Sequence, residues 1–223
     1  ENIRYIHEGG NITTSYNTTG TRELNIKLTL PGEFSVYNSL CAIAVSEHFN
    51  VDEKLLLDAL YNTRVAGRVE PVKVSDDFIV MIDYAHNAMS LESLLSTLRE
   101  YNPNRIVCLF GCGGNRSKLR RFEMGEVSGK MADLTIITSD NPRDEDPALI
   151  MQDIETGIKK TTGSYVMMED RGEAVKYAIE HGEKGDIIVL AGKGHEDYQE
   201  IKGVRYHQTD KELVQKAMED LAR

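Results

Sequence analysis

Cysteine is scarce in this sequence, and no long hydrophobic run is present. The 223 residues include three cysteines, too few for an even disulfide framework, and Cys108 and Cys112 lack the second pair that a zinc site needs. We therefore expect a reducing, cytoplasmic environment in which Cys41 and Cys108 are small buried apolar residues. No apolar stretch approaches the roughly 20 residues of a membrane span. The polar residues 1–20 contain no signal-peptide core.

Basic residues are also fewer than acidic ones. The sequence has 26 Lys and Arg residues against 36 Asp and Glu residues, and its net charge of -10 disfavours a general attraction to nucleic acid or to an anionic membrane. A local basic pocket stays compatible with this balance. The hydrophobic share of 40% supports a packed core. Because the chain begins with Glu1 rather than Met, we expect a processed or excised piece of a longer protein.

Strand-like and helix-like patterns alternate from about Gly67 to the end of the chain. Short apolar segments such as "RIVCLFG" and "DIIVLAG" are separated by stretches with helical spacing. This alternation is typical of an α/β fold with a mostly parallel sheet and helices on both faces. Residues 1–66 differ, since two extended segments precede two helical ones. We predict a domain boundary between residues 1–66 and 67–223, with a hinge at Ala66–Gly67.

Four polar loops follow predicted strands of this sheet. In a parallel sheet, the loops at the carboxyl ends of the strands lie along one edge, where ligands of such folds bind. We therefore expect the four loops to form one site. They are "DYAHN" (residues 83–87), "GCGGNRSK" (111–118), "SDNPRDEDP" (139–147) and "GKGHEDYQ" (192–199).

The "GCGGNRSK" loop combines glycines with cations. Glycines let backbone N–H groups approach an anion, and Arg116, Lys118, Arg120 and Arg121 follow closely. The loop is not a Walker A motif, because GxxxxGK[ST] occurs nowhere in the chain. An anion site and a plain glycine turn between a strand and a helix are both compatible with these residues.

The "SDNPRDEDP" loop holds one arginine among four carboxylates. Pro142 fixes its own φ and biases Asn141 toward extended backbone. The stiffened loop can therefore present Arg143 to a carboxylate in fork geometry, while Asp140 and Asn141 suit an ammonium group. The alternative is a turn that merely caps the helix predicted to begin near Pro147.

The other two loops carry titratable groups. Asp83 stands at a strand end, where acidic residues bind ribose hydroxyls in nucleotide-binding folds; a strand-to-helix turn is the simpler interpretation. Lys193, His195 and Glu196 offer polar groups, but a metal site would need a further ligand, and surface hydrogen bonding is the alternative. Arg68 in "GRVE" is also compatible with a salt bridge at the domain boundary.

Taken together, the motifs resemble those of the Mur ligases of peptidoglycan synthesis. Five stretches occur in the order and spacing of that family: "GRVEPV", "IDYAHN", "FGCGGNRSK", "SDNPRDEDP" and "AGKGHEDYQ". Among the members of the family, they most closely resemble those that add meso-diaminopimelate. The resemblance implies that residues 1–66 end the central ATPase domain. Residues 67–223 would form the C-terminal domain with its dinucleotide-fold-like sheet. The phosphate loop, the activating carbamylated lysine and most ligands of Mg²⁺ would lie upstream.

The activity that the resemblance implies is ATP-dependent amide formation. ATP phosphorylates the terminal carboxylate of UDP-N-acetylmuramoyl-L-alanyl-D-glutamate. The amine of meso-diaminopimelate then attacks the acyl-phosphate, and ADP and phosphate are released. We expect no catalytic residue and no metal ligand in this chain, no nucleic-acid or membrane partner, a monomer, and no activity of the chain by itself.

By resemblance, the amino-acid site lies in three of the loops. Arg143 would face the distal carboxylate of meso-diaminopimelate and Arg116 a second carboxylate, while Glu196 would take the distal ammonium. Charges of both signs suit a ligand with two carboxylates and two amines. The other residues of this site would contribute polar groups, stiffness or backbone: Asp140, Asn141, Pro142 and Gly192.

The nucleotide site maps onto four further residues by the same resemblance. Arg68 and Asp83 correspond to ribose contacts, Asn38 to the adenine contact, and His86 lies beside them.

The sequence departs from the family pattern at two places. The family often has "HTP" where residues 86–88 read "HNA", so we expect a less rigid start of the following helix. The family often has "GKRP" where residues 119–122 read "LRRF". The arginine of the family pattern is present as Arg121, whereas Arg120 replaces a lysine and its role stays open.

Other functions stay compatible with these residues. The chain can be a stand-alone domain that binds an amino acid or nucleotide without chemistry, or a structural module. It can also belong to another Mur-type or folate-type ligase, including the Mur ligase that adds L-lysine. The "DNPR" loop speaks against the last group, because lysine-adding relatives carry a different residue at the position of Arg143.

Overall fold

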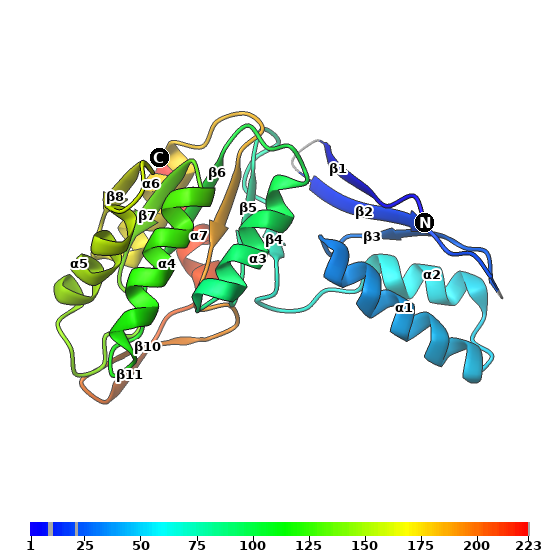
Figure 1. Ribbon diagram of the computed structural model, residues 1–223, viewed down its shortest axis with the longest axis horizontal. Coiled ribbons are helices and arrows are strands. Elements are labelled where there is room, and N and C mark those ends of the chain that lie inside the picture. Colours follow the sequence, from blue (N-terminus) through cyan, green and yellow to red (C-terminus); the bar gives the residue numbers. More distant parts are fainter. Residues whose placement is uncertain (9–10, 21, 223) are drawn as a thin grey trace.

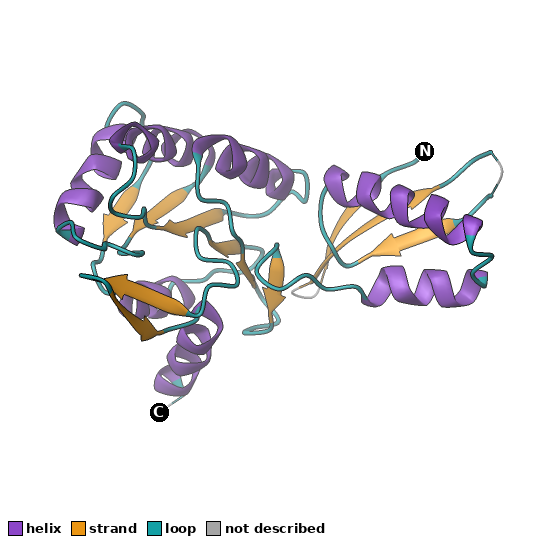
Figure 2. Cartoon of the chain, turned by 90° about the horizontal axis from the view of Figure 1, so that it is seen from below, coloured by secondary structure: helices purple, strands orange, loops and turns teal. Residues whose placement is uncertain are grey.

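Three β-sheets organise the chain, and the largest of them has six strands (Figure 1). The computed structural model describes residues 1–8, 11–20 and 22–222. A three-stranded sheet with two helices lies at the N-terminal side, and the six-stranded sheet lies beside it with helices on both faces (Figures 1 and 2). In the described ranges no helix is long and apolar enough to cross a membrane.

The N-terminal elements form an antiparallel sheet covered by two helices. Along β2, buried residues alternate with more exposed ones, as expected for a strand with one face on a core. Tyr16 and Ile26 pack against Val36 and Ile43 in this core. The elements are β1 Arg4–Glu8, β2 Asn11–Asn17, β3 Asn25–Leu28, α1 Glu33–His48 and α2 Glu53–Asn62.

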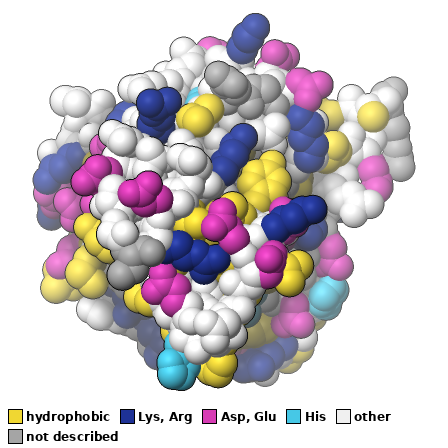
Figure 3. Space-filling view, turned by 90° about the vertical axis from the view of Figure 1, so that its right-hand side faces the viewer, with side chains coloured by type: hydrophobic (Ala, Val, Ile, Leu, Met, Phe, Trp, Pro, Cys, Tyr) yellow, Lys and Arg dark blue, Asp and Glu magenta, His cyan; other side chains and the backbone are white. Residues whose placement is uncertain are grey.

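Helix α1 also carries apolar residues on its outer face. Tyr37, Cys41 and Val45 are four residues apart, so they share one side of the helix, and all three are exposed. The prediction that Cys41 is buried was therefore wrong, whereas Cys108 is buried as predicted. Burial raises the pKa of the Cys108 thiol to about 12. At this end of the molecule, hydrophobic side chains show between basic and acidic ones (Figure 3).

The six-stranded sheet has the order β4-β5-β9-β6-β7-β8. All neighbouring strands are parallel except β4, which pairs antiparallel with β5 at the edge. The mostly parallel sheet predicted from the alternating pattern is confirmed. The strands are β4 Glu70–Val72, β5 Ile79–Ile82, β6 Ile106–Phe110, β7 Leu134–Ile137, β8 Tyr165–Met167 and β9 Ile187–Leu190.

Helices cover both faces of this sheet, as the sequence predicted (Figure 2). Successive strand residues point to opposite faces. Cys108 therefore packs in the core under α3, α4 and α5, and Leu109 packs under α6 and α7. The helices are α3 Ala88–Arg99, α4 Lys118–Met131, α5 Pro147–Ile158, α6 Arg171–Glu180 and α7 Asp210–Leu221.

A small antiparallel hairpin lies outside the large sheet. It consists of β10 Tyr198–Ile201 and β11 Val204–His207. We did not predict it, because its strands carry charged and polar residues and lack a strong apolar alternation. The hairpin follows the "GKGHEDYQ" loop directly and contacts the "SDNPRDEDP" loop through a bridge between Ile201 and Arg143.

Tyr101 joins the N-terminal elements to the large sheet domain. Its hydroxyl lies 2.6 Å from Thr14 Oγ1 and accepts a 3.0 Å hydrogen bond from the backbone N–H of Gly32. All three residues are buried. Gly67, in the connection between the two parts, packs closely against the large sheet domain. A Cβ at this position would lie only 2.2 Å from the backbone nitrogen of His195. The domain boundary and hinge at Ala66–Gly67 stay predictions.

Tyr101→Phe should lower the free energy of unfolding by about 1–3 kcal/mol, because the buried Gly32 N–H and Thr14 hydroxyl lose their shared partner. Urea denaturation followed by far-UV circular dichroism measures the change. Tyr206→Phe is the matched control, since Tyr206 is exposed on the hairpin. Equal unfolding free energies for the two variants would show that the Tyr101 hydroxyl does not stabilise the junction.

Candidate functional site

The site is built where the strand order of the large sheet reverses. The chain passes from β5 to β6 and later returns to place β9 between them. The four polar loops leave the carboxyl ends of β5, β6, β7 and β9. Because these strands are parallel, the loops share one edge, as expected from the sequence. Ligands of open α/β sheets bind at such a reversal.

Two of the loops pack backbone against backbone. The N–H of Gly114 donates a 2.9 Å hydrogen bond to the carbonyl of Asn141. A Cβ on Gly114 would lie 1.9 Å from the carbonyl oxygen of Pro142, and one on Gly113 would lie 2.7 Å from Arg143 Nη1. These glycines therefore make room for the neighbouring loop and its arginine.

Arg143 is held in a defined conformation between these loops. Its backbone is left-handed, with φ 53°. Nη1 donates to the carbonyl of Gly114 at 2.9 Å, and Nε donates to Glu200 Oε2 at 3.3 Å. Within the described part of the chain, Nη2 has no hydrogen-bond partner. This nitrogen is thus available to a ligand carboxylate.

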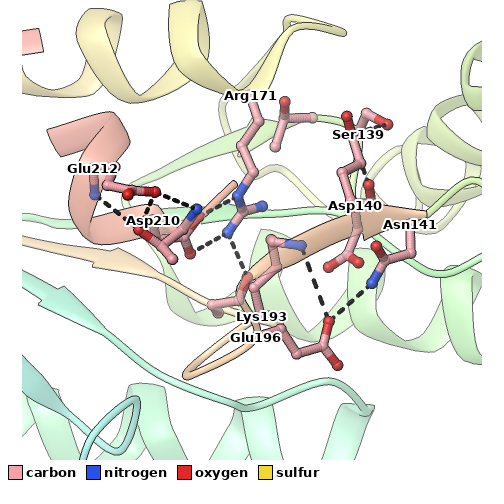
Figure 4. Close-up of polar contacts among 12 residues, drawn as sticks. Ser139, Asp140, Asn141, Arg171, Lys193, Glu196, Asp210 and Glu212 are labelled. Carbon is pink, nitrogen blue, oxygen red and sulfur yellow. Dashed lines mark hydrogen bonds and ion pairs between the residues drawn. The ribbon is translucent and has the colours of Figure 1, made fainter. Parts of the chain in front are cut away.

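Asn141 and Glu196 form a polar pair (Figure 4). Asn141 is 3% exposed, and its Nδ2 donates to Glu196 Oε2 at 2.9 Å. The hydroxyl of Tyr84 donates to the other oxygen of Glu196 at 3.4 Å. The carboxylate is therefore oriented by two different loops, and its negative charge can attract an ammonium group.

Buried charges support the loops from behind (Figure 4). Arg171 and Asp210 are both fully buried as side chains and form a two-bonded ion pair at 2.6 and 2.7 Å. Lys193 is also buried and donates to the carbonyl of Tyr198. Burial lowers the pKa of Lys193, and the nearby Asp140 carboxylate opposes that change. Removing one partner from such a group of buried charges would be costly, so these contacts stabilise the structure beside the loops.

A cavity of about 260 Å³ lies between the loops. Six of the seven residues predicted for the amino-acid site line it, together with His86 from the predicted nucleotide site. The exception is Pro142, which lines a separate cavity of about 660 Å³ on the hairpin side of its loop. The smaller cavity is lined by Tyr84, His86, Gly111, Cys112, Gly113, Arg116, Arg120, Asp140, Asn141, Arg143, Gly192 and Glu196.

The residues predicted for the nucleotide are less closely grouped. Arg68 is exposed and its guanidinium lies 4.9 Å from the ring centre of Tyr84, which in turn packs beside His86. Asp83 is buried and accepts hydrogen bonds from the backbone of Val69 at 2.9 Å and of Ala85 at 2.8 Å.

Burial raises the pKa of Asp83. Its two oxygens thus already order the strand end, and a ribose contact would use their remaining lone pairs. Asn38 is exposed on α1 and does not line the cavity.

The basic residues after the glycine loop have different roles. Arg121 is 1% exposed and binds Asp153 at 2.9 Å and Glu145 at 2.8 Å. It therefore acts as a strut between α4, α5 and the Arg143 loop. Lys118 reaches Asp153 at 3.9 Å on the surface. Arg116 and Arg120 line the cavity.

The departure at residues 86–88 places a capping residue at the start of the next helix. Asn87 is the N-cap of α3, and its side chain accepts a 2.9 Å hydrogen bond from the backbone N–H of Ser90. Ser90 Oγ reciprocates as a capping box. The helix start is thus capped by side chains, and its lower rigidity stays a prediction.

Sequence reasoning did not assign Tyr84, Lys193 or Arg120 to the amino-acid site or the nucleotide site. Tyr84 stands inside the quoted "DYAHN" motif, and Lys193 stands inside "GKGHEDYQ". Their positions in these motifs therefore indicated that both residues lie near the site. Their individual contacts depend on loops that are distant in the sequence. Among the described residues, no group of three or more His, Cys, Asp or Glu side chains is arranged to hold a metal ion.

The chain is similar to known proteins in sequence and in structure. The family model "Mur ligase, glutamate ligase domain" matches residues 67–194. A protein of Caldanaerobacter subterraneus subsp. tengcongensis named UDP-N-acetylmuramoyl-L-alanyl-D-glutamate--2,6-diaminopimelate ligase is 49% identical over 79% of this chain and 36% of its own length. A Clostridium acetobutylicum protein with that name, numbered 1, is 40% identical over 99% of this chain and 45% of its own.

A solved structure carries the same name. It matches with a TM-score of 0.75 and 33% identity, over 99% of this chain and 45% of that one. This chain thus spans less than half the length of these relatives. The family model covers more than half of the residues, including the glycine loop and the Arg143 loop. The chain belongs to the Mur ligase family.

Proposed function

We propose that this chain is the C-terminal part of an ATP-dependent amide ligase that adds meso-diaminopimelate to UDP-N-acetylmuramoyl-L-alanyl-D-glutamate. The observation that carries the proposal is the cavity in which Arg143 and Arg116 stand with Asn141 and Glu196. The names of the similar proteins support the same reaction.

The charges of the cavity match the proposed amino acid. meso-Diaminopimelate carries two carboxylates and two ammonium groups. Arg143 and Arg116 supply cations for the carboxylates, while Asp140 and Glu196 supply anions for the ammonium groups. Gly192 has φ 105°, and a Cβ there would lie 3.1 Å from Asp140 Oδ2, so its backbone lies close to this carboxylate. Pro142 stiffens the loop from its other side.

This arrangement favours meso-diaminopimelate over L-lysine as the substrate. Lysine lacks the distal carboxylate, so its binding would leave Arg143 Nη2 without a ligand partner. A stand-alone amino-acid-binding domain would show the same binding preference without a reaction. The family membership and the nearby residues Arg68, Asp83 and His86, which are predicted for the nucleotide, favour the ligase.

The proposal assigns the remaining parts of the reaction to the rest of the protein. In it, ATP and the UDP-linked dipeptide meet this chain from upstream domains, which also supply the phosphate loop and the Mg²⁺ ligands. Residues of this chain orient the incoming amine for attack on the acyl-phosphate, a contribution of positioning. We further propose that the protein works in the cytoplasm as a monomer.

Arg143→Ala should weaken binding of meso-diaminopimelate to this chain far more than binding of ATP. Loss of a desolvated charge pair costs roughly 2–5 kcal/mol, which is about 30-fold to several thousand-fold in Kd. Discrimination against L-lysine should shrink equally. Isothermal titration calorimetry with each amino acid and with ATP measures these affinities.

Arg205→Ala is the matched control for this experiment. Arg205 is exposed on β11, where its guanidinium lies 4.4 Å from the ring centre of Tyr198, and it does not line the cavity. An unchanged preference for meso-diaminopimelate over lysine in Arg143→Ala would exclude Arg143 as the residue that recognises the distal carboxylate. The loop would then be a capping turn.

The chain by itself should not release phosphate from ATP. No GxxxxGK[ST] sequence is present to hold the phosphates, and phosphoryl transfer depends on such positioning. A phosphate-release assay with ATP, Mg²⁺, the UDP-linked dipeptide and meso-diaminopimelate measures this, with heat-denatured chain as the control. Dipeptide-dependent phosphate release above that control would contradict the prediction.

A further inference from the structure

The β10–β11 hairpin fixes the backbone of the Arg143 loop. The N–H of Arg143 donates to the carbonyl of Glu200 at 2.9 Å, and the N–H of Lys202 donates to the carbonyl of Arg143 at 2.8 Å. Together they form a short parallel bridge between the loop and β10. Arg143 needs such support, because a left-handed backbone is disfavoured for residues with a Cβ.

Side chains extend this contact to the residues before Arg143. The N–H of Glu200 donates to Asn141 Oδ1 at 2.8 Å, and Gln199 Nε2 donates to the carbonyl of Asp140 at 2.8 Å. Asn141 is thereby oriented with its Nδ2 toward Glu196. The hairpin therefore sets the position of three residues predicted for the amino-acid site, Asp140, Asn141 and Arg143.

Glu200 also contacts the guanidinium itself. Its carboxylate accepts from Arg143 Nε at 3.3 Å, while the carbonyl of Gly114 accepts from Nη1 at 2.9 Å. These two hydrogen bonds, one to β10 and one to the glycine loop, restrict rotation of the Arg143 guanidinium. The side chains of Arg143 and Glu200 are 20% and 23% exposed, so solvent screens their ion pair only in part. Preorganisation of this kind reduces the entropy lost when a ligand binds.

We propose that Glu200 is a positioning residue that orients Arg143 for a ligand carboxylate, so that the hairpin sets the preference for an amino acid with a second carboxylate. The inference rests on the proposed function, because it requires Arg143 to recognise that carboxylate. Glu200 acts through Arg143 and does not line the smaller cavity.

The test compares the chain with its Glu200→Ala and Glu200→Gln variants by calorimetry with meso-diaminopimelate and L-lysine. Glu200→Ala should raise the Kd for meso-diaminopimelate about tenfold, as expected for loss of a hydrogen bond to a charged group. The Kd for lysine should change less than about twofold, within the small effect of an exposed charge. Glu200→Gln keeps an acceptor oxygen and should restore most of the affinity. Glu180→Ala, an exposed glutamate at the end of α6, is the control.

A second measurement reads the position of Arg143 without ligand. The Nε–H signal of Arg143 in a nitrogen-15 NMR spectrum is assigned by its loss in Arg143→Lys. Its exchange with water should be faster in Glu200→Ala and close to the original rate in Glu200→Gln. Circular dichroism of each variant confirms that the fold is retained. If Glu200→Ala does not fold, Glu200→Thr carries the test, because its side chain is too short to reach Arg143 Nε and its branched Cβ suits a strand.

The outcomes separate the two proposals. If the original chain does not bind meso-diaminopimelate, the proposed function fails, whereas slow exchange of Arg143 Nε–H that depends on Glu200 would still support the positioning. If the chain binds meso-diaminopimelate and Glu200→Ala changes neither affinity nor exchange, the positioning role alone is wrong. Tighter binding in both Glu200 variants would show that the carboxylate opposes the ligand and would overturn the inference.

Discussion

The insertion of β9 between β5 and β6 is the constraint on which the site depends. Parallel pairing on both sides fixes the direction of β9, so the loop after it must emerge between the loops of its neighbours. The apolar residues Ile187–Leu190 of β9 suit this central placement, because both faces of the strand are covered and all four side chains are buried. Glu196 thereby comes to lie beside Asn141 and Tyr84.

Close backbone contact then converts this topology into a defined site. Gly113 and Gly114 let the Arg143 loop rest on the glycine loop, and the hairpin satisfies the backbone groups of Arg143. The buried Arg171–Asp210 pair stands behind them. Together these contacts restrict the backbone of the loop. They explain how Arg143, which is not a glycine, keeps a left-handed backbone in the lining of the cavity.

Two separate contacts hold the N-terminal elements and their connection against the large sheet domain. Tyr101 joins the large sheet domain to Thr14 and Gly32, while Gly67 packs under His195. Arg68 follows this junction and lies over Tyr84. A ligand that contacts Arg68 and Tyr84 would therefore meet both the junction and the cavity. Asn38 is on α1, outside this group, and its assignment to the nucleotide depends on the family resemblance alone.

The sequence by itself determined the α/β class and the four loops at one sheet edge, because short apolar runs and glycine-rich turns are local patterns that directly reflect strand period and chain reversal. It also identified the charged residues around the cavity through their motifs. Only the tertiary structure decided that Cys41 is exposed, that Arg121 is a strut and that Glu200 meets Arg143. These outcomes depend on contacts between segments far apart in the chain, which no local pattern encodes.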